Sequence, residues 1–423
     1  MVLDNLTVLM LLVVNLIGCL ACIYSFSYIK KYTAPWLFYT LFSLLSAGLN
    51  GVVISGDLFN LFVFLEITSI ASYALVAFGT EAEELEAAFK YLVLGSIAST
   101  MILLAIGMLL GNVSTLNMAD IAVSLNHTGS KDIILYCLAL FIMGFALKSG
   151  LVPMHTWLPD AHPAAPAPVS AMLSGVVIKT IGIYALVRVV FNIIGFNSLI
   201  SSLFIWLGII SMSIGVLLAI GQWDFKRLLA YHSISQIGSV IFAIGLGTPL
   251  GIIGGLFHLF NHSLFKSLLF LNAGAVEYST GLRQLNKLGG LSKAMPVTGV
   301  TSLIASLSIA GLPPMCGFWS KLIIIIAAFQ AKNIIGGIVC ILVSIITLAS
   351  FLKVQKYAFL RVIKDQMLSE IKEVPFSMLL SMVVLALLCV GIGVLFVPVL
   401  NFIIKPAADV LLNGTGYARL ILG

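Results

Sequence analysis

The sequence predicts an all-α integral membrane protein with about twelve transmembrane helices. Hydrophobic residues make up 61% of the 423 residues and charged residues only 9%, whereas an average soluble domain has roughly 25% charged residues. Apolar runs of about 20 residues, the length that a helix needs to cross a hydrocarbon core of roughly 30 Å, follow one another along the chain. We therefore expect a single polytopic membrane domain over residues 1–423.

The first run, Val8 to Tyr28, is long enough to span and lacks the basic start and small-residue cleavage site of a secretory signal. We interpret it as the first transmembrane helix. Charges, Pro and Gly bound eleven further apolar runs, which we predict as helices: Trp36–Ile54, Leu58–Phe78, Ala88–Leu110, Ile133–Val152, Pro168–Val190, Ser198–Ile220, Leu228–Gly245, Ile252–Val276, Val297–Ala331, Ile334–Leu352 and Phe376–Ile403.

Two of these runs are interrupted. The run Val297–Ala331 is too long for one straight helix and contains Gly311-Leu312-Pro313-Pro314, so we predict two half-helices. The fifth run ends in a similar break at Gly150-Leu151-Val152-Pro153. Broken helices at corresponding places in two halves are typical of inverted-repeat transporters. We therefore expect five-helix repeats at residues 36–190 and 198–360, followed by a last transmembrane helix at 376–403.

Lys and Arg in the loops predict the orientation. With the N-terminus outside, thirteen of them lie on the cytoplasmic side and five on the other side. The positive-inside rule therefore favours both termini on the outer side, which for a prokaryote means the outer side of the plasma membrane. The formal net charge of +6 comes mostly from these loops, and no basic patch studded with aromatic residues indicates nucleic-acid binding.

Five ionisable residues interrupt the apolar helices: Glu66, Lys148, Lys179, Lys266 and Lys321. A lysine near the middle of a membrane helix costs about 2.5–3.5 kcal/mol on insertion scales, so such residues indicate function. A lysine whose carboxylate partner can be withdrawn is a switchable proton site. The alternatives are a structural ion pair between Glu66 and Lys148, and a Lys321 that caps the free carbonyls of the preceding half-helix.

His258, His262 and Lys266 share one helix face, because a spacing of four residues turns only about 40° per step. Histidine titrates near neutral pH and can both accept and donate a proton, as a relay between lysines requires. The two histidines could instead bind a metal ion, but no Glu or Cys joins them locally. We predict no metal site and no cofactor, since the six cysteines show no ligand grouping and no Rossmann-type glycine motif occurs.

Four further residues could border an ion path: Asp57, Asp160, His162 and His232. Asp57 lies at the mouth of the third predicted helix and is expected at the interface, while His155, Asp160 and His162 follow the first break and could line a cavity or lie in a surface loop. His232 lies in the eighth predicted helix.

Four stretches resemble the antiporter-like subunits of complex I, of Mrp cation/proton antiporters and of energy-converting membrane-bound hydrogenases: GDLFNLFVFLE at 56–66, ALKSGLVPMHTWLPDAH at 146–162, KRLLAYHSISQIG at 226–238 and HLFNHSLFK at 258–266. The resemblance covers roughly Trp36 to Phe396, and the first stretch looks most like the Mrp D-type and hydrogenase branch. It implies that Glu66 pairs with Lys148 of the broken helix, and that Lys179 is the bridging lysine of the next helix. By the same resemblance, His258, His262 and Lys266 match the relay on the central helix and Lys321 the terminal lysine, while His232 replaces a serine that many members carry.

The resemblance implies a proton-translocating subunit that carries no electrons itself and works with other membrane subunits of a redox-driven respiratory or hydrogenase complex. One alternative is a Na⁺(K⁺)/H⁺ antiporter subunit of an Mrp-type complex, with Asp57 or Glu66 near the ion path. The other is a structural membrane scaffold with an inert ion-pair network.

Overall fold

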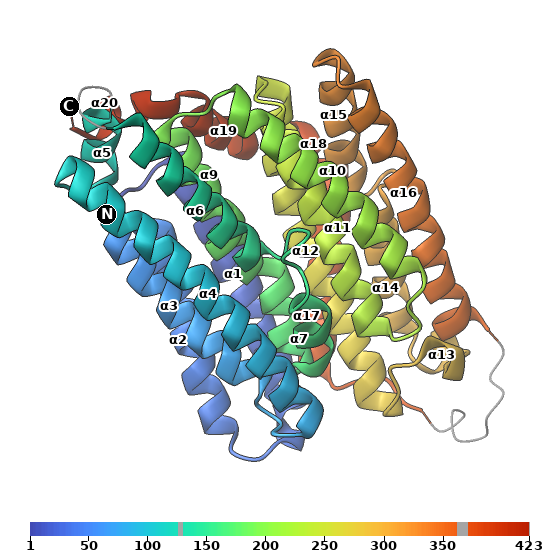
Figure 1. Cartoon of the computed structure of the whole chain (residues 1–423). Coiled ribbons are helices and arrows are strands. Elements are labelled where there is room, and N and C mark those ends of the chain that lie inside the picture. Colours follow the sequence, from blue (N-terminus) through green and yellow to red (C-terminus); the bar gives the residue numbers. More distant parts are fainter. Residues whose placement is uncertain (126–129, 362–370, 423) are drawn as a thin grey trace.

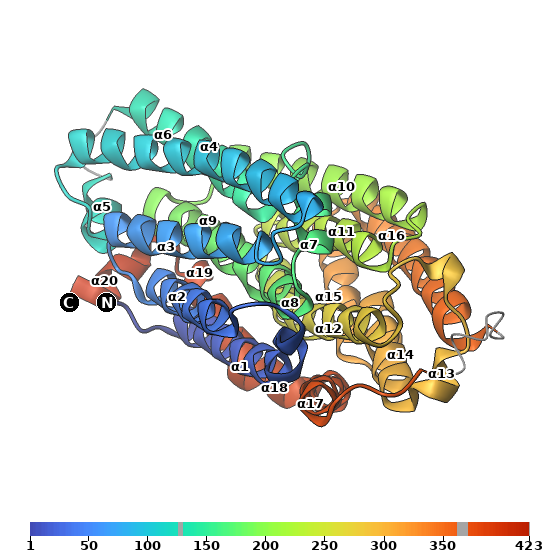
Figure 2. The ribbon, with the colours of Figure 1, turned by 90° about the horizontal axis from the view of Figure 1, so that it is seen from below.

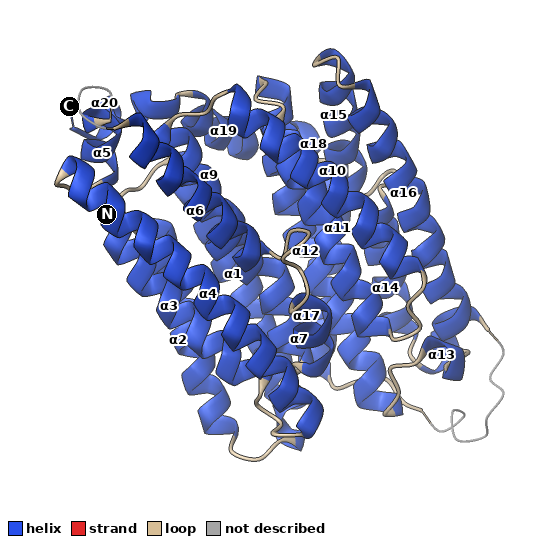
Figure 3. Ribbon diagram, viewed as in Figure 1, coloured by secondary structure: helices blue, strands red, loops and turns tan. Residues whose placement is uncertain are grey.

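The computed structural model describes residues 1–125, 130–361 and 371–422, and within these ranges the chain forms helices joined by loops and two isolated bridges (Figure 3). The first half contains α1 (Asn5–Tyr28), α2 (Pro35–Ile54), α3 (Leu58–Val76), α4 (Ala82–Val113), α5 (Met118–Ser124), α6 (Lys131–Ser149), α7 (Leu158–Ala164), α8 (Ala167–Met172) and α9 (Ala185–Val187). The second half contains α10 (Ser198–Ile220), α11 (Phe225–Gly245), α12 (Pro249–Thr280), α13 (Leu291–Ala294), α14 (Pro296–Ala310), α15 (Cys316–Gln330), α16 (Ile334–Val354), α17 (Phe376–Val394), α18 (Phe396–Val399), α19 (Lys405–Leu412) and α20 (Tyr417–Leu422). Wider π-type turns at Leu173–Tyr184 and Arg188–Ile194 extend α8 and α9 into one segment.

The predicted fold class is confirmed. Among the described residues, ten helical segments are long and apolar enough to cross a membrane, and α14 and α15 are two shorter apolar helices. The charged ninth run lies in α12, which has 32 residues. Each of the twelve predicted runs therefore falls mainly on helix.

Both predicted helix breaks occur where glycine and proline are. α6 ends at Ser149 and α14 at Ala310, and in each case the following glycine has a positive φ, +70° at Gly150 and +81° at Gly311. This left-handed conformation is one that glycine adopts without a Cβ clash. The two breaks have related sequences, Gly-Leu-Val-Pro-Met and Gly-Leu-Pro-Pro-Met.

The halves share a second feature. Asp57 caps α3 and forms an isolated antiparallel bridge with Asn117, while Asp224 caps α11 and bridges to Gln284. The first bridge lies at the end of the bundle that carries both termini, and the second lies at the opposite end (Figure 1). We propose from these shared features that residues 36–190 and 198–360 are two repeats of opposite orientation.

The central helix is α12. It packs against α8, α11, α14, α15 and α17, and the view along the bundle places it among these helices (Figure 2). All its residues from Leu256 to Val276 are buried. The charged face of α12 therefore points into protein rather than into lipid.

The C-terminal region departs from a single last span. α17 ends at Val394, before the predicted end at Ile403, and the chain then continues through α18 and α19 across the end of the bundle near the termini (Figure 1). At that end Arg188 of the segment after α9 forms an ion pair with Asp4, the N-cap of α1, at 2.6 Å. This contact fixes the start of the chain to the bundle.

A buried row of lysines and histidines as the candidate functional site

Glu66 of α3 and Lys148 of α6 lie together. Lys148 Nζ is 3.7 Å from Glu66 Oε1, and it donates hydrogen bonds to Ser69 Oγ at 2.8 Å and Tyr73 OH at 3.4 Å. Ser99 of α4 donates a hydrogen bond to the same carboxylate oxygen. The Lys148 side chain is 1% exposed and that of Glu66 is 31% exposed, so the pair reaches from the interior to the flank of the bundle.

The segment that carries Lys179 is held between two neighbouring helices at glycines. A Cβ at Gly182 would lie 2.7 Å from the Cβ of Ser149, next to Lys148, and a Cβ at Gly175 would lie 2.0 Å from Ser267 Oγ on α12. Such close approach is typical of small residues between membrane helices. The backbone carrying Lys179 therefore touches both the broken helix and the central helix.

Two serine hydroxyls join the surroundings of Lys179 to those of Lys266. Lys179 Nζ donates to the carbonyl of Ser174, and the Ser174 and Ser233 hydroxyls are 2.7 Å apart. Ser233 Oγ also donates to the carbonyl of Leu229 at 3.2 Å, and the same carbonyl accepts a hydrogen bond from Lys266 Nζ. Among the described residues, no carboxylate forms an ion pair with Lys179 or Lys266.

The histidines of α12 continue this arrangement. The rings of His258 and His262 are nearly parallel, with centroids 6.2 Å apart. His258 Nδ1 is 3.0 Å from Ser320 Oγ of α15, and its Nε2 is 3.1 Å from Gln236 Oε1 of α11. His258 therefore connects the central helix to the half-helix that carries Lys321.

Lys321 lies beside the second break. Its Nζ donates to the carbonyl of Ile309 in the last turn of α14 at 2.7 Å, which is the contact that a capping role requires. Its side chain also fills the space over Gly311, where a Cβ would lie 2.8 Å from Lys321 Cδ. We call Glu66, Lys148, Lys179, His258, His262, Lys266 and Lys321 together the polar row.

Several buried polar atoms beside the polar row have no hydrogen-bond partner within the described protein. Both ring nitrogens of His162, His232 and His262 are among them, as are Gln236 Nε2, Asn261 Oδ1, Asn272 Nδ2 and Thr180 Oγ1. Buried polar groups of this kind are usually satisfied by ordered water. The row is therefore a polar interior in which water can bind between the titratable groups.

The other predicted candidates divide between this interior and the two ends. His162 is fully buried, with its ring 5.2 Å from that of Phe270, which in turn lies 5.5 Å from Lys266 Nζ. His232 is also fully buried, with its ring 4.9 Å from that of Phe351. His155 is only partly buried, in the loop after the first break.

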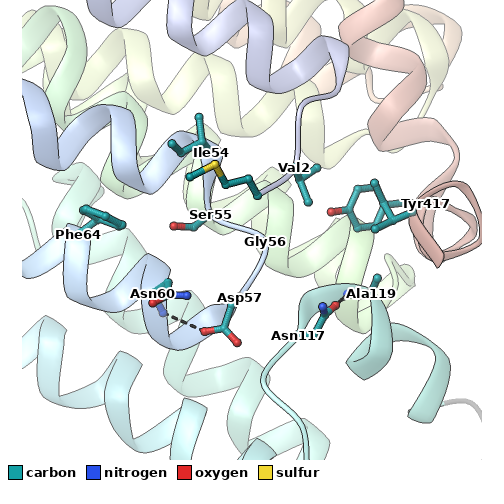
Figure 4. Close-up of a pocket in the computed structure, with 12 residues that line it drawn as sticks. Val2, Ile54, Ser55, Gly56, Asp57, Asn60, Phe64, Asn117, Ala119 and Tyr417 are labelled. Carbon is teal, nitrogen blue, oxygen red and sulfur yellow. Dashed lines mark hydrogen bonds between the residues drawn. The ribbon is translucent and has the colours of Figure 1, made fainter.

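Asp57 lies away from the polar row. Its Oδ1 accepts hydrogen bonds from the backbone N–H groups of Phe59 and Asn60, which caps α3. It borders a cavity of about 320 Å³ near the chain termini, with Asn117 and Tyr417 among the other wall residues (Figure 4). Asp57 is thus a helix cap at an aqueous opening.

Asp160 lies at the opposite end. It forms an ion pair with Lys90 at 3.0 Å and faces Arg227 at 3.7 Å, and all three line a cavity of about 300 Å³. Asp160 lies in the short helix α7 rather than in a surface loop, and its side chain, 29% exposed, lines this cavity.

Glu277, Lys226 and the serine pair were not among the residues predicted from sequence. Lys226 Nζ lies 2.6 Å from Glu277 Oε2, but the predicted ninth run stops at Val276, whereas α12 continues to Thr280. The sequence did contain a signal for Glu277. It follows Lys266 by three helical turns and so would share its helix face if the helix continued. Ser174 and Ser233 carry no sequence signal, since serines are common in this chain's helices.

Comparisons with known proteins agree with this arrangement. The family described as "NADH:quinone oxidoreductase/Mrp antiporter, TM" matches residues 55–347, and the family described as "NADH-Ubiquinone oxidoreductase (complex I), chain 5 N-terminus" matches residues 1–39. The D-type subunit of the Na⁺/H⁺ antiporter of Alkalihalophilus pseudofirmus is 35% identical over 428 aligned residues, covering 100% of this chain and 85% of that protein.

Two solved structures are similar over nearly the whole chain. A chain of the Mrp complex from Dietzia has a TM-score of 0.91 and 29% identity, covering 100% of this chain and 86% of that one. A chain of the membrane-bound sulfane sulfur reductase, an archaeal respiratory membrane complex, has a TM-score of 0.90 and 31% identity, covering 98% and 84%. With its two broken helices and its polar row, this chain belongs to the family of antiporter-like membrane subunits shared by NADH:quinone oxidoreductases and Mrp antiporters.

Proposed function

We propose that this chain translocates protons as an antiporter-like subunit of a redox-driven respiratory or hydrogenase membrane complex, and that the protons move along the polar row. The observation that carries the proposal is that Lys179 and Lys266 are both buried and bond to the carbonyls of Ser174 and Leu229, with the Ser174 and Ser233 hydroxyls between these acceptors. Among the described residues neither lysine forms an ion pair with a carboxylate.

A charged ammonium group without a counter-ion is expensive inside a membrane protein, and such residues are usually functional. Lysines and histidines that alternate with hydroxyls and unpartnered polar atoms offer successive sites where a proton can rest. An inert scaffold needs none of these groups, because an apolar core would hold the helices together at lower cost.

Glu66 supports the presence of neighbouring membrane subunits. It lies on the same stripe of α3 as Phe59, Val63 and Ile70, which are exposed apolar residues. A partly exposed carboxylate on a membrane-facing stripe is costly against lipid, so a neighbouring subunit that covers this stripe also stabilises the helix. We place the complex in the prokaryotic plasma membrane with both chain termini on the outer side, because the positive-inside rule favours this orientation.

A second candidate function is Na⁺(K⁺)/H⁺ antiport in an Mrp-type complex. It is favoured by the Alkalihalophilus relative, which is named as part of a Na⁺/H⁺ antiporter and aligns with the whole chain, and by the cavity beside Asp57 at one end. The polar row serves proton movement in both cases, and the two functions differ in the driving reaction and in the second ion.

The test uses the purified complex in sealed vesicles, with internal pH followed by a dye while the driving reaction runs. Wild type should acidify or alkalinise the lumen without added Na⁺, and Lys266→Ala should abolish this change in a fully assembled complex. Proton movement only in the presence of a Na⁺ or K⁺ gradient would favour antiport. Normal proton movement by Lys266→Ala would refute the proposed path.

A further inference from the structure

An ion pair between α11 and α12 lies at the end of the bundle opposite the termini. Lys226 Nζ forms an ion pair with Glu277 Oε2 at 2.6 Å and donates a hydrogen bond to the carbonyl of Ala165 at 3.2 Å. The Lys226 side chain is 3% exposed and that of Glu277 is 22% exposed. Glu277 therefore lies at the border between the interior and water.

Glu277 is aligned with the polar row. It follows Lys266 by eleven residues on one continuous helix, a turn of about 1,100° that leaves it only about 20° from Lys266 around the helix axis. The distance along the axis is roughly 16 Å at 1.5 Å per residue. The inner face of α12 therefore carries His262, Lys266 and Glu277 in line.

Glu277 borders a cavity at this end of the bundle. A cavity of about 430 Å³ is lined by Glu277, Lys226, Tyr32, Glu84, Arg283 and Lys287. Arg283 Nε lies 3.9 Å from Glu277 Oε1. Water in this cavity can reach the carboxylate.

Tyrosines of α1 follow the stretch of α12 between Glu277 and Lys266. Tyr24 OH donates to the carbonyl of Leu271 at 2.9 Å, and a Cβ at Gly274 would lie 3.0 Å from the Tyr24 hydroxyl oxygen. The Tyr28 ring centroid is 5.7 Å from that of Tyr24. Tyr32, just beyond the end of α1, has its ring centroid 6.2 Å from that of Tyr28 and lines the cavity. Phenol hydroxyls thus lie beside the part of α12 that joins Lys266 to Glu277.

We propose that Glu277, held by Lys226, is the protonation site through which the polar row exchanges protons with the aqueous side opposite the termini. The Glu277 carboxylate takes a proton from water in the cavity. Because the carboxyl group is then neutral, its electrostatic attraction to Lys226 weakens. The proton then passes inward to Lys266 when that residue is a free amine, so Lys266 becomes an ammonium group and Glu277 returns to a carboxylate. This proposal rests on the proposed function.

The competing role is purely structural, in which the pair only fastens α11 to α12. The double substitution Lys226→Met and Glu277→Met separates the two roles, because replacing a buried ion pair by apolar side chains of similar size is often neutral or stabilising. A structural pair predicts normal proton movement in the assembled double variant. A protonation site predicts at least a tenfold lower rate of proton movement with unchanged assembly and thermal stability.

The matched control is Glu86→Met, which removes an exposed carboxylate at the same end of the bundle and should keep the wild-type rate. Charge reversal, Lys226→Glu with Glu277→Lys, should keep the wild-type thermal stability but should not give the wild-type rate. If the double methionine variant moves protons at the wild-type rate while Lys266→Ala does not, Glu277 is not the protonation site. The proposal that protons move along the polar row is then still supported. If neither variant lowers the rate, the proposed function itself fails.

Discussion

Lys148 Nζ lies 3.7 Å from Glu66 Oε1, yet the lysine side chain is 1% exposed and the glutamate side chain 31% exposed. This asymmetry is the feature that a movable ion pair needs, because the carboxylate can respond to a neighbouring subunit while the lysine stays inside the bundle. In the proposed path, a carboxylate that turned away would leave the ammonium group without its counter-ion and so favour release of a proton.

The serine bridge should matter for transport and little for folding. Ser174→Ala removes one hydroxyl of the pair that lies between the acceptors of Lys179 and Lys266. We expect about a tenfold lower rate of proton movement, since the loss of one hydrogen bond in a buried network costs roughly 1 kcal/mol or more. Ser344→Ala, which removes a hydroxyl that donates to the carbonyl of Cys340 in its own helix, should leave the rate unchanged. Equal rates in the two variants, measured in vesicles, would remove the serine bridge from the path.

Gly182 should set the spacing between the helices that carry Lys148 and Lys179. In Gly182→Ala the new Cβ would meet Ser149 Cβ at 2.7 Å and Ser149 Cα at 2.9 Å, so the helices must separate, at a cost of about 1–3 kcal/mol. Thermal unfolding in detergent should show the lower stability, and the vesicle assay a lower rate. Gly107→Ala on α4 is the control, because its Cβ would meet nothing within 4 Å and alanine is the better helix former. A destabilisation as large in this control would contradict the packing argument for Gly182.

The ion pair between Asp4 and Arg188 should make stability depend on pH in the acid range. Burial of Asp4 by itself raises the pKa of its carboxyl group, but the hydrogen bonds and positive charge of Arg188 outweigh burial and hold that pKa below its ordinary value. Because the pKa is lower in the folded state, the stabilisation is fully present above the ordinary pKa of Asp and is lost as the pH falls through the folded value.

Asp4→Asn should therefore destabilise the protein at neutral pH, by roughly 3 kcal/mol if breaking this mostly buried pair leaves the guanidinium group uncompensated. The difference in unfolding midpoint between wild type and variant should shrink below about pH 4. A difference that stays constant from pH 7 to pH 3 would mean that the Asp4 charge contributes nothing.

The predictable and the unpredictable features of this chain have separate physical causes. Helix spans follow from apolar length, and the breaks at Gly150 and Gly311 follow from glycine with proline nearby, so both could be predicted from sequence. The end of α12 could not, because hydropathy falls at Glu277 while Lys226 and the cavity allow the helix to continue. The acceptors of Lys179 and Lys266 are backbone carbonyls, which no side-chain pattern reveals.

The most direct test of the central claim, that protons move along the polar row, is proton movement by the assembled complex in sealed vesicles for Lys148→Ala beside Lys131→Ala. Both lysines lie on α6, but Lys148 is buried beside Glu66, whereas Lys131 is exposed at the start of the helix. We predict that Lys148→Ala loses proton movement at wild-type assembly and that Lys131→Ala keeps it. Equal rates in the two variants would contradict the claim.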